Sequence, residues 1–235
     1  MATIYLFRHG QASFGAENYD KLSSLGERQA TILGEYLAAS GIKLDAAYSG
    51  GLERQRNTCR LTLLAQDRQV VHNIDERFDE VRNDEHIEKI LPNLAKSDSR
   101  LNLLMEDAMQ NSKNYQKIIE AVFNHWVSPE CNTTGIQTWA EYSSGTQAAM
   151  AELRDKEGSG KTIGVFTSGG TIATITTQIL GLDGSHAYKF YEPIINCSIT
   201  QLFYNSKKIS ISNFNDYSYL QQKGAASGET LVTYR

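Results

Sequence analysis

A histidine and an arginine stand side by side directly after the first apolar run of the chain. Arg8, His9 and Gly10 follow residues 4–7, whose apolar character is typical of a buried strand. The pair would therefore lie at the carboxyl end of a strand, the edge at which open α/β sheets hold their ligands. A neutral imidazole can attack phosphorus, and a neighbouring guanidinium can bind the phosphoryl oxygens bidentately. With Gly10 allowing close backbone approach, the tripeptide indicates phosphoryl transfer; a surface turn is the alternative.

Further motifs follow this tripeptide in a fixed order and together span nearly the whole chain. They are Arg8-His9-Gly10-Gln11-Ala12-Ser13, Leu22-Ser23-Ser24-Leu25-Gly26-Glu27-Arg28-Gln29-Ala30, Ser49-Gly50-Gly51-Leu52-Glu53-Arg54 with Thr58, Phe78-Asp79-Glu80, Phe166-Thr167-Ser168-Gly169-Gly170 and Phe214-Asn215-Asp216. This combination resembles the histidine phosphatase superfamily, also called phosphoglycerate-mutase-like. The resemblance implies an enzyme whose Arg-His-Gly histidine is transiently phosphorylated.

The resemblance assigns roles to four catalytic residues. His9 would be the nucleophile, and Arg8 and Arg54 would hold the phosphoryl oxygens, because guanidiniums supply directional donors that a lysine lacks. Arg56 could compete with Arg54 for this role. Glu80 would be the general acid, since 78–80 resembles the segment that carries the acid in the family.

Acidic residues crowd the stretch around Glu80, so a solvated acidic loop is the alternative there. They are Asp75, Glu76, Asp79, Asp84 and Glu85. A carboxyl group close to phosphate should have a raised pKa, because like charge disfavours ionisation.

Ser168 departs from the family pattern, which has a second histidine before the Gly-Gly turn. A serine hydroxyl can donate one hydrogen bond to a phosphoryl oxygen, but it carries no charge. The hydroxyl, together with the backbone N–H groups of Gly169 and Gly170, would suffice for turnover. Two other outcomes stay open: His125 or His186 replaces the missing ring, or the protein binds phosphate and turns over poorly.

Three polar residues in the loop after the nucleophile could also reach the phosphate or its ester oxygen. They are Gln11, Ser13 and Asn18, and we include Gln11 and Asn18 among the expected phosphate-binding residues. Turn residues that satisfy the backbone are the alternative for each.

The pattern of apolar residues predicts an α/β fold: a three-layer αβα sandwich with a mostly parallel central sheet flanked by helices. Strands are expected at 3–7, 45–49, 70–74, 161–167, 197–204 and 209–214, the last two as a hairpin. A helix is expected at 24–39, with Ser24 as its N-terminal cap and Gly41 as its stop. Two more helices are expected, one at 52–66 and one that follows the turn at 168–171 and runs to about residue 180. Residues 224–228 read as a loose tail segment.

Residues 84–157 are polar, helical in period and interrupted at Pro92 and Pro129, so we expect a helical insertion there. Placed over the active-site edge, this cap would contribute substrate contacts and exclude water; surface helices without such a role are the alternative. We expect one domain, 1–235, since this length suffices to bury a core.

Composition narrows the remaining possibilities. A net charge of −4 and an estimated pI of 5.8, without a Lys/Arg-rich block, predict neither a nucleic-acid nor a membrane partner. Three widely spaced cysteines suggest neither disulfides nor a zinc site, and no signal or transmembrane segment is evident, so we expect a cytoplasmic protein. We expect no metal and no cofactor. The oligomeric state, a homodimer included, stays open.

These observations favour a histidine acid-type phosphatase acting on a small phosphorylated metabolite or a phosphorylated side chain. A phosphoglycerate mutase is a second possibility, although such mutases carry a tryptophan and an asparagine soon after the tripeptide, where this chain has residues 11–15, Gln-Ala-Ser-Phe-Gly. A phosphate-binding module that has lost turnover is the third. Substrate identity would depend on the inserted helices.

Overall fold

The computed structural model describes residues 2–13, 20–65, 69–108 and 111–234. Within these residues, six strands form one sheet in the order β3-β2-β4-β1-β5-β6. The strands are β1 (Ala2–Arg8), β2 (Ala46–Ser49), β3 (His72–Ile74), β4 (Thr162–Thr167), β5 (Ile199–Tyr204) and β6 (Ile209–Asp216). Strands β3, β2, β4 and β1 are parallel, and β5 and β6 form the expected antiparallel hairpin. The predicted α/β class is confirmed.

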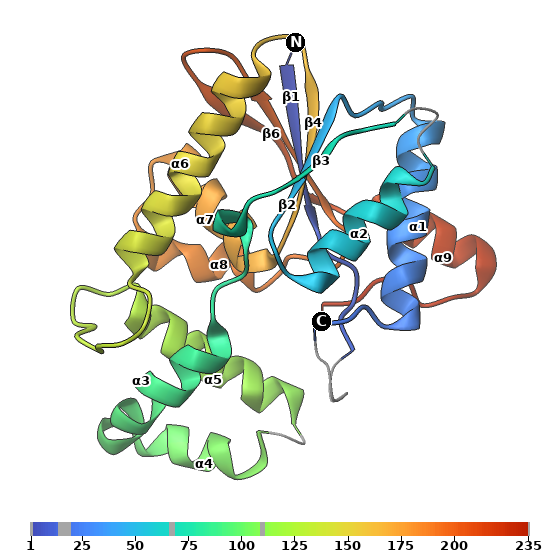
Figure 1. Cartoon of the computed structure of the whole chain (residues 1–235). Helices are drawn as coiled ribbons and strands as arrows, with labels where there is room; N and C mark the ends of the chain where they lie inside the picture. Colours follow the sequence, from blue (N-terminus) through green and yellow to red (C-terminus); the bar gives the residue numbers. More distant parts are fainter. Residues whose placement is uncertain (1, 14–19, 66–68, 109–110, 235) are drawn as a thin grey trace.

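Helices cover both faces of this sheet, because its strands bury apolar side chains on both sides. In β1, Ile4 and Leu6 join one core and Phe7 joins the other. The first face packs against α6 (Trp139–Glu157) and α7 (Gly169–Leu180), with α8 (Ala187–Tyr191) beside them. The second face packs against α1 (Ser24–Ala39), α2 (Glu53–Leu63) and α9 (Ser218–Ser227). Figure 1 shows these two helical layers on either side of the sheet.

The topology opens a crevice at the carboxyl ends of β1 and β4. Strand β1 connects through α1 to β2 on one side, whereas β4 connects through α7 and α8 to β5 on the other side. Neighbouring strands whose connections leave in opposite directions leave a gap between their following loops, where ligands bind in open α/β sheets. His9 follows β1 and Ser168 follows β4, so the sequence motifs meet at this point.

Three further helices form a cap beyond the carboxyl edge of the sheet (Figure 1). They are α3 (Asn83–Ser97), α4 (Ser99–Asp107) and α5 (Ser112–Trp126). Their own apolar core includes Ile90, Ile118 and Trp126, and it closes against Tyr142 of α6 and Tyr188 of α8. The predicted insertion, 84–157, therefore has two structural parts, because α6 packs against the sheet. Two short 3₁₀ turns, η1 (Glu76–Phe78) and η2 (Gly184–His186), complete the elements.

Several local expectations differ from the structure. Ser23 caps α1, one residue before the predicted Ser24: its side chain accepts the Gly26 N–H. Pro92 lies inside α3 and does not end it, whereas Pro129 falls between α5 and α6 as expected.

Residues 224–228, which were expected to be loose, belong to α9 and the glycine that follows it. Gly224 is buried there, and a Cβ at this position would lie only 2.6 Å from the carbonyl oxygen of Glu229. Glycine is therefore needed at this position because the next segment packs closely against it, and not because the chain is loose there. In the part of the chain that the structure describes, no helix is long and apolar enough to cross a membrane.

The loop that carries His9 lies directly against the start of α1, which gives a test of the fold. A Cβ at Gly26 would stand 2.1 Å from the carbonyl oxygen of Gln11, whereas one at Gly145 in α6 would stand 4.0 Å from Arg77. We expect Gly26→Ala to lower the free energy of unfolding by about 1–3 kcal/mol, because backbone must move. Gly145→Ala should raise it by about 0.5–1 kcal/mol.

Urea unfolding followed by circular dichroism measures both changes in the same buffer. Equal stability of wild type and Gly26→Ala would show that the two backbone segments are not in contact.

Candidate active site

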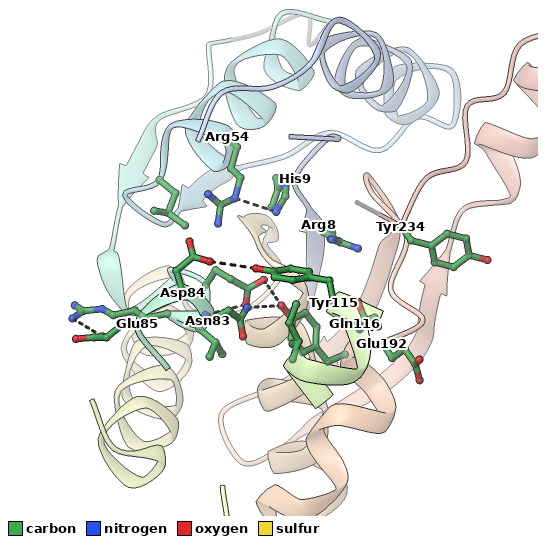
Figure 2. Close-up of a pocket in the computed structure, with 16 residues that line it drawn as sticks. Arg8, His9, Arg54, Asn83, Asp84, Glu85, Tyr115, Gln116, Glu192 and Tyr234 are labelled. Atoms are coloured by element: carbon green, nitrogen blue, oxygen red, sulfur yellow. Dashed lines mark hydrogen bonds and ion pairs between the residues drawn. The ribbon is translucent and has the colours of Figure 1, made fainter. Parts of the chain in front are cut away.

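A cavity of about 770 Å³ lies between the carboxyl edge of the sheet and the cap, in the size range of small-molecule sites. Figure 2 shows that its lining side chains come from both parts. The lining residues are Arg8, His9, Leu52, Arg54, Glu80, Val81, Arg82, Asn83, Asp84, Glu85, Tyr115, Gln116, Ile119, Tyr191, Glu192 and Tyr234. All four predicted catalytic residues therefore line one cavity.

The His9 ring is buried, with one nitrogen committed to the backbone. Nδ1 lies 2.7 Å from the carbonyl oxygen of Gly10, which can only accept, so Nδ1 carries the proton and donates. Nε2 therefore holds the lone pair, and it accepts from Nε of Arg54 at 3.3 Å. Burial, then the charges of Arg54 and Arg8, holds the pKa of His9 well below its usual range. The ring is thus neutral, with its lone pair on Nε2.

Backbone contacts fix the loop that presents this ring. The His9 N–H donates to the Thr167 carbonyl at 2.9 Å, and Nδ2 of Asn196 donates to the His9 carbonyl at 3.1 Å. The Gly10 N–H donates to Oγ1 of Thr58 at 3.0 Å, and that hydroxyl donates to the Arg54 carbonyl at 2.7 Å. Thr58 therefore joins the nucleophile loop to the helix that carries Arg54.

Arg54 projects from the first turn of α2 and is 8% exposed. Its Nη1 lies 2.7 Å from Oδ1 of Asp20, a residue that the sequence reasoning did not single out. Arg56 does not line the cavity. It lies near His72 instead, whose pKa is lowered mainly by burial and to a smaller extent by the charge of Arg56. Of the two candidate arginines, the structure places Arg54 in the site.

Arg8 supplies the second guanidinium, from the last position of β1. It is 8% exposed, and its Nη1 donates to the carbonyl oxygen of Ile194. Figure 2 shows Arg8 and Arg54 on either side of His9. An anion at Nε2 would therefore lie between two positive charges.

Glu80 reaches the cavity from the loop after η1. Its Oε1 accepts the N–H groups of Val81 and Gly170, each at 2.9 Å, so a proton on this carboxyl group would sit on Oε2. Burial raises the pKa of Glu80, while Arg54, Arg8 and these two N–H groups oppose the rise. The neighbouring acids have other partners: Asp75 pairs with Arg77, and Asp79 accepts the Gly51 N–H. Two further acids line the cavity: Asp84 accepts from the Tyr115 hydroxyl at 3.4 Å, and Glu85 pairs with Arg82 at 3.7 Å. Glu80, which lies near Arg8 and Arg54, stays the candidate proton donor.

Ser168 and Gly169 are not among the cavity-lining residues. Ser168 is fully buried, and its Oγ accepts from Nε2 of Gln55 at 2.8 Å. The Gly170 N–H at the start of α7 is occupied by Glu80, and a Cβ at Gly169 would press on the Tyr191 ring at 2.9 Å. The start of α7, expected to face phosphate, thus holds a carboxylate in this structure.

Gln11 and Ser13 are also not among the cavity-lining residues. Gln11 bonds to Ser23 and, through its N–H, to Gln29, and the Ser13 N–H donates to the Lys21 carbonyl. Asn18 lies outside the described residues. His125 and His186 do not line the cavity either, so neither replaces the second histidine here.

The sequence predicted that a cap would contribute substrate contacts, but it did not identify which cap residues line the cavity, and it missed the chain's last segment. Asn83, Asp84, Tyr115 and Gln116 enter the cavity from α3 and α5, and Tyr234 enters from beyond α9. The 3.6-residue period of apolar residues predicted helices in the cap, but the sequence of a helix does not indicate which of its faces lies toward His9. Among the described residues, no group of three or more His, Cys, Asp or Glu side chains is arranged to hold a metal ion.

The electrostatic environment of His9 gives a second test. We expect its imidazole to stay neutral as the pH falls from 8 to below 6.5, because the charged form is desolvated and faces two guanidiniums. Arg54→Met should raise the pKa of His9, since it removes one of these charges, while Arg56→Met should leave it unchanged. Nitrogen-15 NMR of the ring measures both. Protonation of His9 near pH 6.5 in the wild type would contradict the described environment.

Comparisons with known proteins agree with this architecture. The family model "Histidine phosphatase superfamily (branch 1)" matches residues 4–217. Among curated proteins, the search found no significant match.

Three solved structures illustrate the likeness in fold. Bacillus stearothermophilus YhfR is 18% identical, with a TM-score of 0.67 over 93% of this chain and 99% of that one. A mutant phosphoserine phosphatase from Entamoeba histolytica, in complex with phosphoserine, is 18% identical, with a TM-score of 0.63 over 94% and 100%. Phosphoglycerate mutase from Bacillus anthracis is 18% identical, with a TM-score of 0.62 over 93% and 94%.

The family match covers most of the chain, and it includes the segments that place His9, Arg54 and Glu80 around one cavity. The chain therefore belongs to the histidine phosphatase superfamily, branch 1.

Proposed function

We propose that the protein is a phosphohydrolase that removes a phosphoryl group from a small phosphorylated molecule or side chain through a phosphohistidine at His9. The observation that carries this proposal is the tautomer of the His9 ring. With its proton held by the Gly10 carbonyl, Nε2 keeps its lone pair beside Arg54 and at the wall of the cavity.

In the first step, Arg8 and Arg54 bind the phosphoryl oxygens. The Arg54 Nε–H gives up its hydrogen bond to Nε2 of His9 and donates to a phosphoryl oxygen of the substrate, which frees Nε2. Nε2 then attacks phosphorus, forming the N–P bond as the bond to the ester oxygen breaks. Glu80 gives its proton to the departing oxygen, so the alcohol leaves neutral. The raised pKa of Glu80 favours the protonated form that this step needs.

In the second step, water replaces the alcohol. Glu80, now a carboxylate, takes a proton from the water as its oxygen attacks phosphorus and the N–P bond breaks. Inorganic phosphate leaves, and Glu80 is again protonated. The two guanidiniums supply the positive charge for both steps, so we propose that no metal ion is required.

The relatives support the same class of reaction. Phosphoserine phosphatase and phosphoglycerate mutase, by their names, both act on phosphate esters. We favour hydrolysis over mutase activity because the residues after His9 lack the tryptophan and asparagine expected of mutases. The substrate's alcohol would contact the cap side chains that line the outer cavity.

Removal of the nucleophile tests the proposal directly. We expect His9→Ala to lower the hydrolysis of p-nitrophenyl phosphate by at least about a thousandfold, since no covalent intermediate can form. Acid quenching of the wild type with ³²P-labelled substrate should trap an acid-labile phosphoenzyme that the variant lacks. His186→Ala, outside the cavity, is the matched control.

Two results would overturn this proposal. Equal rates for wild type and His9→Ala between pH 4 and 7.5 would favour a phosphate-binding module. Transfer between 3- and 2-phosphoglycerate that exceeds hydrolysis would favour a mutase.

The buried Gln55–Ser168 pair gives a separate test of the missing second histidine. Because the Gln55 amide lies 2.8 Å from Oγ of Ser168, an imidazole at 168 would need the space of that amide. We expect Ser168→His alone to lower stability without raising kcat. Combined with Gln55→Ala, it should raise kcat at least about tenfold over Gln55→Ala, because a charged donor is added.

The four members of this cycle are compared by p-nitrophenyl phosphate kinetics and urea unfolding. If Ser168→His gains as much activity alone as with Gln55→Ala, the amide does not exclude the ring.

A further inference from the structure

Asp20 makes two close contacts at the start of α2, and both of its carboxylate oxygens are used. Oδ1 lies 2.7 Å from Nη1 of Arg54, and Oδ2 accepts the Glu53 N–H at 2.7 Å. The ion pair is largely enclosed: the Arg54 side chain is 10% exposed and that of Asp20 is 32% exposed. A carboxylate held by two donors at once is fixed in position.

This carboxylate determines how the Arg54 guanidinium is turned. The guanidinium is planar, so fixing Nη1 while Nε points to Nε2 of His9, 3.3 Å away, fixes the whole plane. Removing Asp20 would remove one of the contacts that hold this orientation. A clamp that is held before substrate binds needs no reorganisation during the reaction.

The chain segment that carries Asp20 is tied to the nucleophile loop. Ala12 pairs with Leu22, and the Ser13 N–H donates to the Lys21 carbonyl at 2.8 Å. The same loop that begins at His9 therefore returns to place Asp20 against the helix that bears Arg54.

We propose that Asp20 is a positioning residue that orients the Arg54 guanidinium for the transition state of phosphoryl transfer. This inference rests on the proposed function. Asp20 also carries negative charge close to the place where a phosphate dianion would bind, so it repels the bound ground state. Its benefit would therefore appear in the transition state, where the geometry around phosphorus changes, and not in ground-state binding.

This balance predicts opposite effects of Asp20→Asn on binding and on rate. The amide oxygen can still accept the Glu53 N–H, but it loses the charge that holds Arg54. We expect kcat for p-nitrophenyl phosphate to fall about 10- to 100-fold, because misplaced catalytic groups cost on that order. KM, and the dissociation constant of inorganic phosphate, should stay unchanged or decrease.

Vanadate provides the readout that a merely structural role would not change. It mimics the five-coordinate transition state, so its dissociation constant should rise by about the same factor as kcat falls. Asp20→Glu, which keeps the charge, should recover part of both losses. Glu53→Gln, in the same turn of α2, is the matched control and should leave kcat and both dissociation constants unchanged.

Isothermal titration calorimetry with phosphate and vanadate measures binding even in a protein that does not turn over. If wild type lacks hydrolysis but Asp20→Asn still weakens vanadate selectively, the proposed function fails and the positioning role stands. If wild type hydrolyses through His9 and Asp20→Asn leaves kcat and vanadate affinity unchanged, the positioning role is wrong. Equal weakening of phosphate and vanadate would also overturn it.

Should Asp20→Asn fail to fold, Asp20→Ser replaces it, because the hydroxyl can accept the Glu53 N–H. The same selective loss of vanadate affinity is expected, and its absence contradicts the proposal.

Discussion

The hydrogen bond from Nδ1 of His9 to the Gly10 carbonyl is the contact on which the whole site depends. A neutral imidazole has one N–H and one lone pair, and this bond decides which nitrogen carries each. The bond joins neighbouring residues of one loop, so it needs no distant partner. Burial and the charges of Arg54 and Arg8 then hold the pKa of the ring well below its usual range.

Placing two guanidiniums in a site with so little solvent is expensive, and the structure offsets that cost with fixed acceptors. Arg8 donates to the Ile194 carbonyl, and Arg54 pairs with Asp20. These partners accept some of the hydrogen bonds that each guanidinium can donate, and they hold its orientation. An incoming phosphoryl group would complete the remaining charge balance, so under the proposed function the same arrangement would both bind the anion and stabilise charge during transfer.

Sequence reasoning predicted the parts of the fold that depend on short-range pattern. The strand before Arg8, the helix 24–39 and the strand-turn-helix around Ser168 follow from apolar period and turn residues, and they place the motifs at one sheet edge. It could not predict which neighbours occupy a buried atom. Nothing local to Ser168 indicates that Gln55, more than a hundred residues earlier, holds its hydroxyl. Likewise, Asp20 gains its role only through a tertiary contact with α2.

The cap has its own apolar core, formed by α3, α4 and α5 and closed against α6 and α8. Side chains on α5 therefore reach the cavity from a core that does not include His9, Arg54 or Glu80, whereas Asn83 is linked to Glu80 through the Tyr191 hydroxyl. Under the proposed function, the residues that would contact the alcohol and those that would cleave the phosphate ester are thus carried largely by separate layers of one chain. Substitutions at Tyr115 or Gln116 would then change substrate preference while the residues around His9 stay the same.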